Sequence, residues 1–163
     1  IWQTVYNGGN WVESNGEDKY RKGVYTYLKR TSPYPSFLTF DAGSREVSTV
    51  RRTVTNTPLQ ALVTLNDPVY LETAYHLAKI MRQGKNVDSS IRKGYKKAVL
   101  SDISEEKLSA LKELYNSSLS DFQEKPKNVK EFIPFETDTD ANLAALTVVA
   151  NAIMNLDEFL TKS

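Results

Sequence analysis

The stretch "RRTVTNTPLQALVTLNDP", residues 51–68, carries two successive signals for the start of a helix. Thr57 suits the N-cap, a proline takes the first helical position, and Gln60 completes the capping box T-P-L-Q. Asp67 repeats the pattern, since it is again followed by a proline that suits the first helical position. The stretch therefore predicts a helix, a sharp corner and a second helix.

The spacing of apolar residues predicts which side of each helix is buried. In the first helix, the expected buried face consists of Leu59, Leu62 and Val63. In the second helix, the residues expected to share a face are Leu71, Tyr75 and Ala78. We expect Gly84 to end the second helix, because glycine readily adopts the backbone conformation found at helix C-termini.

The chain before this corner is less regular. Residues 18–31, "DKYRKGVYTYLKRT", are predicted to form a helix because their apolar side chains recur at helical spacing. Residues 32–53 contain two prolines and no helical period, so they are predicted to form a long, structured loop. Residues 1–17 are rich in Gly and Asn, which predicts an ordered but irregular arm anchored by Trp2 and Trp11.

Three further helices are predicted after the corner. The first is marked by Ile91, Tyr95 and Val99. The second begins after Ser104, with Ile103 and Leu108 in the positions of a hydrophobic staple, and is followed by a charged connection over residues 124–132. The last begins at about Ala141 and is apolar on almost every side, which places it at the centre of the core.

The composition excludes several kinds of partner and site. The formal net charge is only +1, so we expect no nucleic-acid partner, because proteins that bind nucleic acids present strong positive charge. The chain contains no cysteine, which excludes disulfides, thiolate zinc sites and iron–sulfur clusters within it. No apolar run approaches the roughly 20 residues that cross a bilayer, so no membrane insertion by this segment is expected.

These patterns together predict a mainly α-helical protein. We expect a single irregular helical domain over residues 1–163, with an ordered N-terminal arm over 1–17 and a helical body over 18–163. The body is expected to include the long structured loop and the central C-terminal helix. The sequence begins without Met, and we expect it to be the C-terminal part of a larger multidomain protein.

Polar side chains gather in the predicted loop and at the corner. The residues expected to bind a ligand are Arg45, Arg51, Arg52, Asn56, Gln60 and Asp67. Two interpretations are open: the arginines form an internal lattice of ion pairs, or they bind a saccharide or an anionic ligand in a cleft. Adjacent residues of an extended segment point to opposite sides. We therefore expect one of Arg51 and Arg52 to be buried against Asp67 or Asp41 and the other to face the cleft.

The sequence assigns no catalytic residue and no metal site. His76 is the only histidine, which excludes a multi-histidine site, and we expect it to be an ordinary half-buried residue. The run "DTDAN" at 138–142 is similar to the start of a calcium loop, but Leu143 and Val149 occupy the positions that require Gly and Glu. Capping of the following helix explains the same acidic residues. We expect no cofactor within this chain.

Two stretches carry a family resemblance. Residues 25–74, "YTYLKRTSPYPSFLTFDAGSREVSTVRRTVTNTPLQALVTLNDPVYLETA", and residues 146–162, "LTVVANAIMNLDEFLTK", resemble the planctomycete-type, cytochrome-c-associated C-terminal domain of unknown function, family 1553. The resemblance covers most of the chain. One departure is Ser48, because members of that family often carry a cysteine shortly before the double arginine.

The resemblance implies a cell-envelope or secreted setting, upstream domains of the same protein as partners, and haem in an upstream domain of some members. It implies no established reaction. We therefore interpret the chain as a non-catalytic interaction or scaffold module of a large exported protein. The alternative is an enzyme or half-site acting on carbohydrate or another exported polymer, with Asp41, Glu46 and Asp67 as candidate acids or bases.

Overall fold

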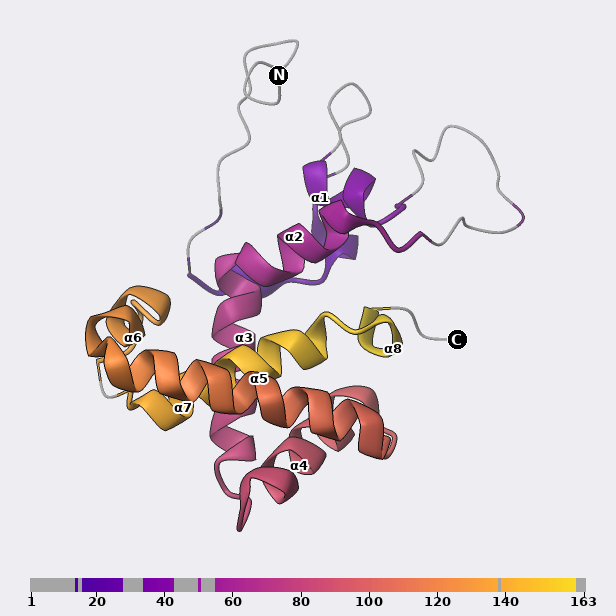
Figure 1. Ribbon diagram of the computed structural model, residues 1–163. Helices are drawn as coiled ribbons and strands as arrows, with labels where there is room; N and C mark the ends of the chain where they lie inside the picture. Colours follow the sequence, from indigo (N-terminus) through magenta and orange to yellow (C-terminus); the bar gives the residue numbers. More distant parts are fainter. Residues whose placement is uncertain are drawn as a thin grey trace. The chain divides into compact units, whose positions relative to one another are not determined.

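The computed structural model describes residue 14, residue 50 and the ranges 16–27, 34–42, 55–137 and 139–160. The chain divides into two compact units, Ile1–Gln60 and Ala61–Ser163. Regular structure within the described residues is entirely helical, without a strand, which confirms the prediction of a mainly α-helical protein (Figure 1). The single domain over 1–163 and its place in a larger protein stay predictions.

The second unit contains most of the helices. Helix α2 begins in the first unit and ends in the second. The helices and their bounds are α2 (Pro58–Asn66), α3 (Pro68–Met81), α4 (Val87–Val99), α5 (Glu105–Glu124), α6 (Pro126–Phe132), α7 (Ala141–Met154) and α8 (Asp157–Leu160). The predicted helix, sharp corner and second helix are therefore present as α2, Asp67 and α3.

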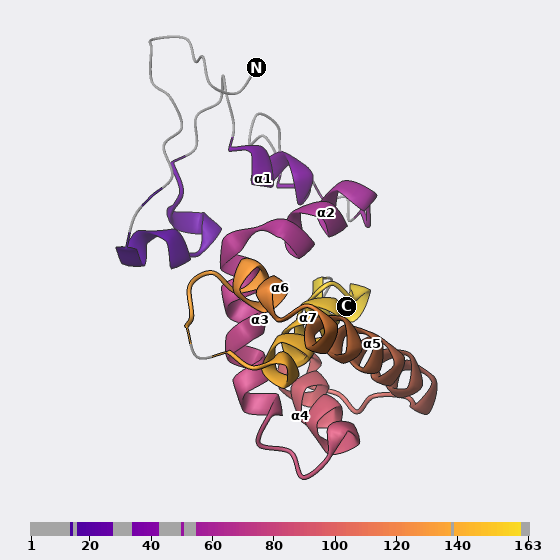
Figure 2. The ribbon, with the colours of Figure 1, turned by 60° about the vertical axis from the view of Figure 1, so that its left-hand side comes forward.

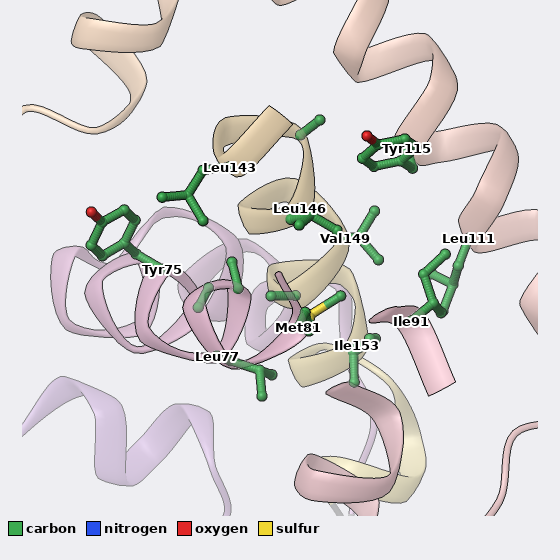
Figure 3. Packing of buried hydrophobic residues seen from close by; sticks show 14 of the residues in the cluster. Tyr75, Leu77, Met81, Ile91, Leu111, Tyr115, Leu143, Leu146, Val149 and Ile153 are labelled. Carbon is green, nitrogen blue, oxygen red and sulfur yellow. The ribbon is translucent and has the colours of Figure 1, made fainter. Parts of the chain in front are cut away.

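Helix α7 forms the centre of the second unit. It is apolar on nearly every side, and most of its residues are buried. It packs against α3 and α5 and also touches α4, and Figures 1 and 2 show it lying among these helices. Figure 3 shows side chains from all four helices meeting in one cluster, including Tyr75, Met81, Ile91 and Leu111. The prediction of a central C-terminal helix is confirmed.

Side-chain caps fix where several helices begin. Asp67 accepts hydrogen bonds from two backbone N–H groups in the first turn of α3, at 2.8 and 3.3 Å. Ser104 accepts one at the start of α5, at 3.4 Å, and Asp140 accepts one at the start of α7, at 2.7 Å. Each bond satisfies a donor that has no partner within its own helix. The predicted starts of these three helices are confirmed.

The helix predicted over residues 18–31 is wrong for the part that the structure describes. Two short 3₁₀-helices, η1 (Gly16–Tyr20) and η2 (Gly23–Tyr25), are present instead, and the backbone between them is extended at Lys22. The apolar residues that were expected on a buried face are exposed, namely Tyr20 at 51%, Val24 at 71% and Tyr27 at 72%. A short α-helix is only marginal in water without a buried face, and Gly23 weakens this one further.

Two segments predicted as connections contain short helices. Helix α1 (Pro35–Thr39) lies inside the predicted loop over 32–53, and α6 lies inside the charged connection over 124–132. Both begin at a proline, which suits the first helical position, but segments this short show too little periodicity for a prediction. Residues 32–33, 43–49 and 51–53 of the loop, and most of the predicted arm, lie outside the described residues.

Candidate functional site

The six residues predicted to bind a ligand divide into two groups. Arg45, Arg51 and Arg52 lie outside the described residues, so the expected ion pairs and the expected division of roles between Arg51 and Arg52 stay predictions. Asn56, Gln60 and Asp67 are described. Asn56 is exposed, Gln60 is buried in the first unit, and Asp67 is half-buried at the corner.

Asp41 and Thr55 join the two flanks of the segment that contains the three arginines. Oδ2 of Asp41 accepts hydrogen bonds from the Thr55 backbone N–H at 2.8 Å and from the Thr55 hydroxyl at 2.7 Å. Asp41 follows α1 in the left-handed region, with φ of +54°, and the N–H of Ala42 donates to the carbonyl of Phe37 at 2.8 Å. This backbone pattern ends many helices. The end of α1 therefore holds the Asp41 carboxylate against Thr55.

Gln60 connects the same flanks to the first turn of α2. Its Oε1 accepts from the N–H of Thr57 at 2.9 Å, and its own N–H donates to the Thr57 hydroxyl at 3.3 Å, which confirms the predicted capping box. Its Nε2 donates to the carbonyl of Thr39 at 2.8 Å and to Thr55 Oγ1 at 3.2 Å. Both ends of the Gln60 amide thus bind groups of the protein itself. Sequence reasoning identified the capping box but missed Thr39 and Thr55 as partners.

The hydrogen bonds at Asp41 favour its charged form. The Thr55 hydroxyl holds the pKa of the Asp41 carboxyl below its ordinary value of 3.8, and the Thr55 N–H and Gln60 act in the same direction. Desolvation opposes this effect without overcoming it. A general acid that works near neutral pH needs a raised pKa instead. Asp41 is therefore suited to holding the chain rather than to donating a proton.

The second described carboxylate of the candidate set also has a structural role. Asp67 caps α3 through Oδ1, which accepts from the N–H groups of Val69 and Tyr70. The third candidate acid or base, Glu46, lies outside the described residues. Both described carboxylates thus accept hydrogen bonds from backbone N–H groups.

His76 is exposed on α3, rather than half-buried as expected from the sequence. Its ring lies edge-to-face with that of Tyr75, with 5.8 Å between centroids. Within the described ranges, no group of three or more His, Cys, Asp and Glu side chains is placed to hold a metal ion. Among the helices of those same ranges, none is both long enough and apolar enough to cross a bilayer.

Helix α2 turns its apolar side outward. Leu59, Leu62 and Leu65, which we call the leucine face, are 54%, 59% and 44% exposed. On the opposite side Gln60 and Thr64 are buried, at 4% and 0% exposed. The prediction that Leu59 and Leu62 are buried is therefore wrong. Periodicity separates the two faces of a helix, but the partners available elsewhere in the chain decide which face turns inward.

A known protein family matches the part of the chain that contains the predicted binding residues. The profile of a family described as "Protein of unknown function (DUF1553)" matches residues 3–115, which include every residue of the predicted binding set. Searches of curated proteins and of solved structures find no match. The family match spans more than half of the 163 residues, and the chain therefore belongs to the DUF1553 family of proteins of unknown function.

Proposed function

We propose that this chain is a non-catalytic interaction module that binds a neighbouring domain of the same polypeptide through the leucine face of α2. The observation that carries the proposal is the orientation of α2, which exposes three leucines while Gln60 and Thr64 are buried. Single exposed leucines are common on protein surfaces. Several on one side of a helix, with polar residues on the buried side, are typical of a helix that is recognised through its apolar face.

The size of the leucine face favours a tethered partner. A stable complex between independent proteins buries about 800 Å² on each partner, and three half-exposed leucines provide only a fraction of that area. A partner on the same polypeptide needs less area, because the linker keeps its effective concentration high. An upstream domain is also the partner that the family resemblance implies.

The described carboxylates support a non-catalytic role. Asp41 is bonded to Thr55, and Asp67 caps α3, so each carboxylate stabilises local structure. No described contact favours the alternative of an enzyme or half-site acting on carbohydrate or another exported polymer. That alternative and the binding of a saccharide or anionic ligand stay predictions.

The proposal includes a setting for the protein. We place the module in the cell envelope or outside the cell, beside an upstream domain that holds haem. The support for this setting is the resemblance of residues 25–74 and 146–162 to the cytochrome-c-associated family. The sequence of the full-length gene product tests it directly, since a CxxCH motif upstream of this segment would provide the haem attachment site.

A binding experiment tests the proposed surface. The upstream part of the full-length polypeptide is expressed separately and titrated with this chain by calorimetry. We expect binding that Leu62→Asp abolishes, because a carboxylate on the leucine face must be desolvated in the complex. The matched control is Leu100→Asp, which changes another exposed leucine, 77% exposed, at the end of α4. The control is expected to bind like the unchanged chain.

Two outcomes contradict the proposal. If Leu62→Asp and Leu100→Asp bind equally well, the leucine face is not the binding surface. If the isolated chain hydrolyses a polysaccharide and Asp67→Ser does so less, the chain is an enzyme. Serine is chosen because it retains the N-cap of α3 while removing the carboxylate.

A further inference from the structure

A polar stripe runs along one side of helix α7 and includes Asn155, the residue that follows it. Thr147, Asn151 and Asn155 recur every four residues and therefore lie on one side of the helix. Thr147 is fully buried and Asn151 is 5% exposed. The Thr147 hydroxyl donates to the carbonyl of Leu143, four residues earlier in α7, at 2.8 Å. The other two side chains bind α2.

Helix α2 is joined to α7 by two hydrogen bonds. The Thr64 hydroxyl donates to Oδ1 of Asn155 at 2.7 Å, and Nδ2 of Asn151 donates to the carbonyl of Leu65 at 3.2 Å. The Leu65 carbonyl is in the last turn of α2, where carbonyl groups lack donors from their own helix. Asn151 thus caps α2 from a different helix. We call Thr64, Asn151 and Asn155 the polar seam.

The polar seam lowers the stability of the contact between α2 and α7. Among the described residues, Oδ1 of Asn151 is buried without a hydrogen-bond partner. A buried acceptor without a partner destabilises the folded state, and apolar side chains of similar volume avoid that penalty. The contact between α2 and α7 is therefore not the arrangement that maximises stability.

The seam also works against the usual orientation of an amphipathic helix. Thr64 lies on the side of α2 opposite the leucine face, so the bonds to Asn151 and Asn155 require the leucines to point away from α7. Turning α2 by half a turn would bury the leucines against the two amides and would break both bonds. Buried polar groups that must be paired can specify a single packing orientation in this way.

We infer that the polar seam fixes the rotation of α2 about its axis and thereby keeps the leucine face exposed. Because the polar side of α2 occupies the contact with α7, the leucine side chains are not buried there. They remain exposed and available to a partner. The inference rests on the proposed function only for the use of the leucine face. The orientation of α2 itself is measurable without any partner.

The absence of cysteine makes the orientation accessible to thiol labelling. Leu62→Cys places a single thiol on the leucine face, and its reaction rate with a neutral maleimide reports its exposure. We expect rapid labelling when the seam is intact. In the same chain, Asn151→Leu combined with Asn155→Leu removes the seam and offers an apolar surface to α2. We expect labelling to slow by about tenfold as α2 turns its apolar side inward.

The matched control is Thr147→Val in the Leu62→Cys chain, because Thr147 is buried on the same helix but bonds only to α7 among its described contacts. Its labelling rate is expected to equal that of the Leu62→Cys chain. Equal rates with and without the seam would overturn the inference. If the double leucine variant does not unfold cooperatively, Thr64→Val combined with Asn151→Leu decides by the same comparison, since this pair also removes both hydrogen bonds between α2 and α7. These labelling outcomes are independent of whether Leu62→Asp abolishes binding.

Discussion

Gly94 of α4 lies directly against the side chain of Met81 of α3. A β-carbon at position 94 would be 2.5 Å from both Cγ and Sδ of Met81, and Met81 is fully buried. A glycine inside a helix normally costs about 1 kcal/mol relative to alanine. Here the close approach of α3 and α4 requires it.

Gly94→Ala is therefore expected to destabilise the protein, although alanine is the better helix former. Overpacking a core typically costs about 1–3 kcal/mol, so after the gain of about 1 kcal/mol in helix propensity we expect a net loss of up to about 2 kcal/mol in urea unfolding. Met81→Ala alone should cost about 2–5 kcal/mol. The new β-carbon fills part of the cavity that Met81→Ala leaves. The double variant should therefore lose at least about 0.5 kcal/mol less than the sum of the single losses, and strict additivity would contradict the contact.

Leu100 ends α4 in a conformation that favours glycine. Its φ is +65° and its side chain is 77% exposed, so the β-carbon is strained and burial gives little compensation. We expect Leu100→Gly to raise the free energy of unfolding by about 1 kcal/mol, measured by urea or thermal unfolding. Leu100→Ala is the control, because it removes the exposed side chain but keeps the β-carbon. An equal effect of the two substitutions would rule out backbone strain as the cause.

Substitutions at Gln60 and Thr57 distinguish the stability contributed by the capping box from that contributed by the hydrogen bond between Gln60 and the Thr39 carbonyl. Gln60→Glu keeps the acceptor for the Thr57 N–H but replaces the Nε2 donor, leaving the Thr39 carbonyl opposite a carboxylate. We expect a loss of about 1–3 kcal/mol in chemical unfolding. Thr57→Ala, which removes only one side of the box, should cost about 1 kcal/mol. Unchanged stability in Gln60→Glu would show that the bond to Thr39 contributes nothing.

The lowered pKa of the Asp41 carboxyl predicts a specific pH dependence of the protein's stability. The unfolded carboxyl titrates near 3.8 and the folded one at lower pH, so its contribution to stability is present above pH 3.8 and is lost as pH falls through the folded pKa. Asp41→Asn should therefore be less stable than the unchanged chain at neutral pH. This gap in stability between the two proteins should close as the pH becomes acidic. Thermal unfolding across pH measures this gap. Thr55→Val should reduce it only in part, because the backbone N–H of Thr55 remains. A gap that is constant with pH would contradict the assignment.

Local signals account for the parts of the fold that the sequence predicted. The start of α3 is determined by Asp67 and the following proline, and the start of α5 by Ser104, since a cap and its partners are neighbours in sequence. The central position of α7 follows from its own composition. Each of these predictions depends on residues within one or two helical turns.

Contacts between distant residues account for what the sequence did not predict. The orientation of α2 depends on bonds from Thr64 to Asn155 and from Asn151 to Leu65, and no local pattern in α2 shows that these partners exist. The two hydrogen bonds from Thr55 to Asp41 were likewise missed because the residues are 14 positions apart in the sequence. The prediction of a helix over residues 18–31 was wrong for its described part because distant parts of the chain do not bury the apolar residues there. These residues are exposed, so they lack the burial that would stabilise an α-helix.

The central position of α7 has a consequence for synthesis on the ribosome. Proteins are synthesised from the N-terminus onward, so α3, α4 and α5 are translated before Ala141–Met154. Their apolar faces have no α7 to pack against during that interval. A chaperone that binds apolar segments can therefore bind this chain after α3 has left the ribosome and before α7 packs against it. A nascent chain that stalls before residue 141 exposes the surfaces that a finished chain buries.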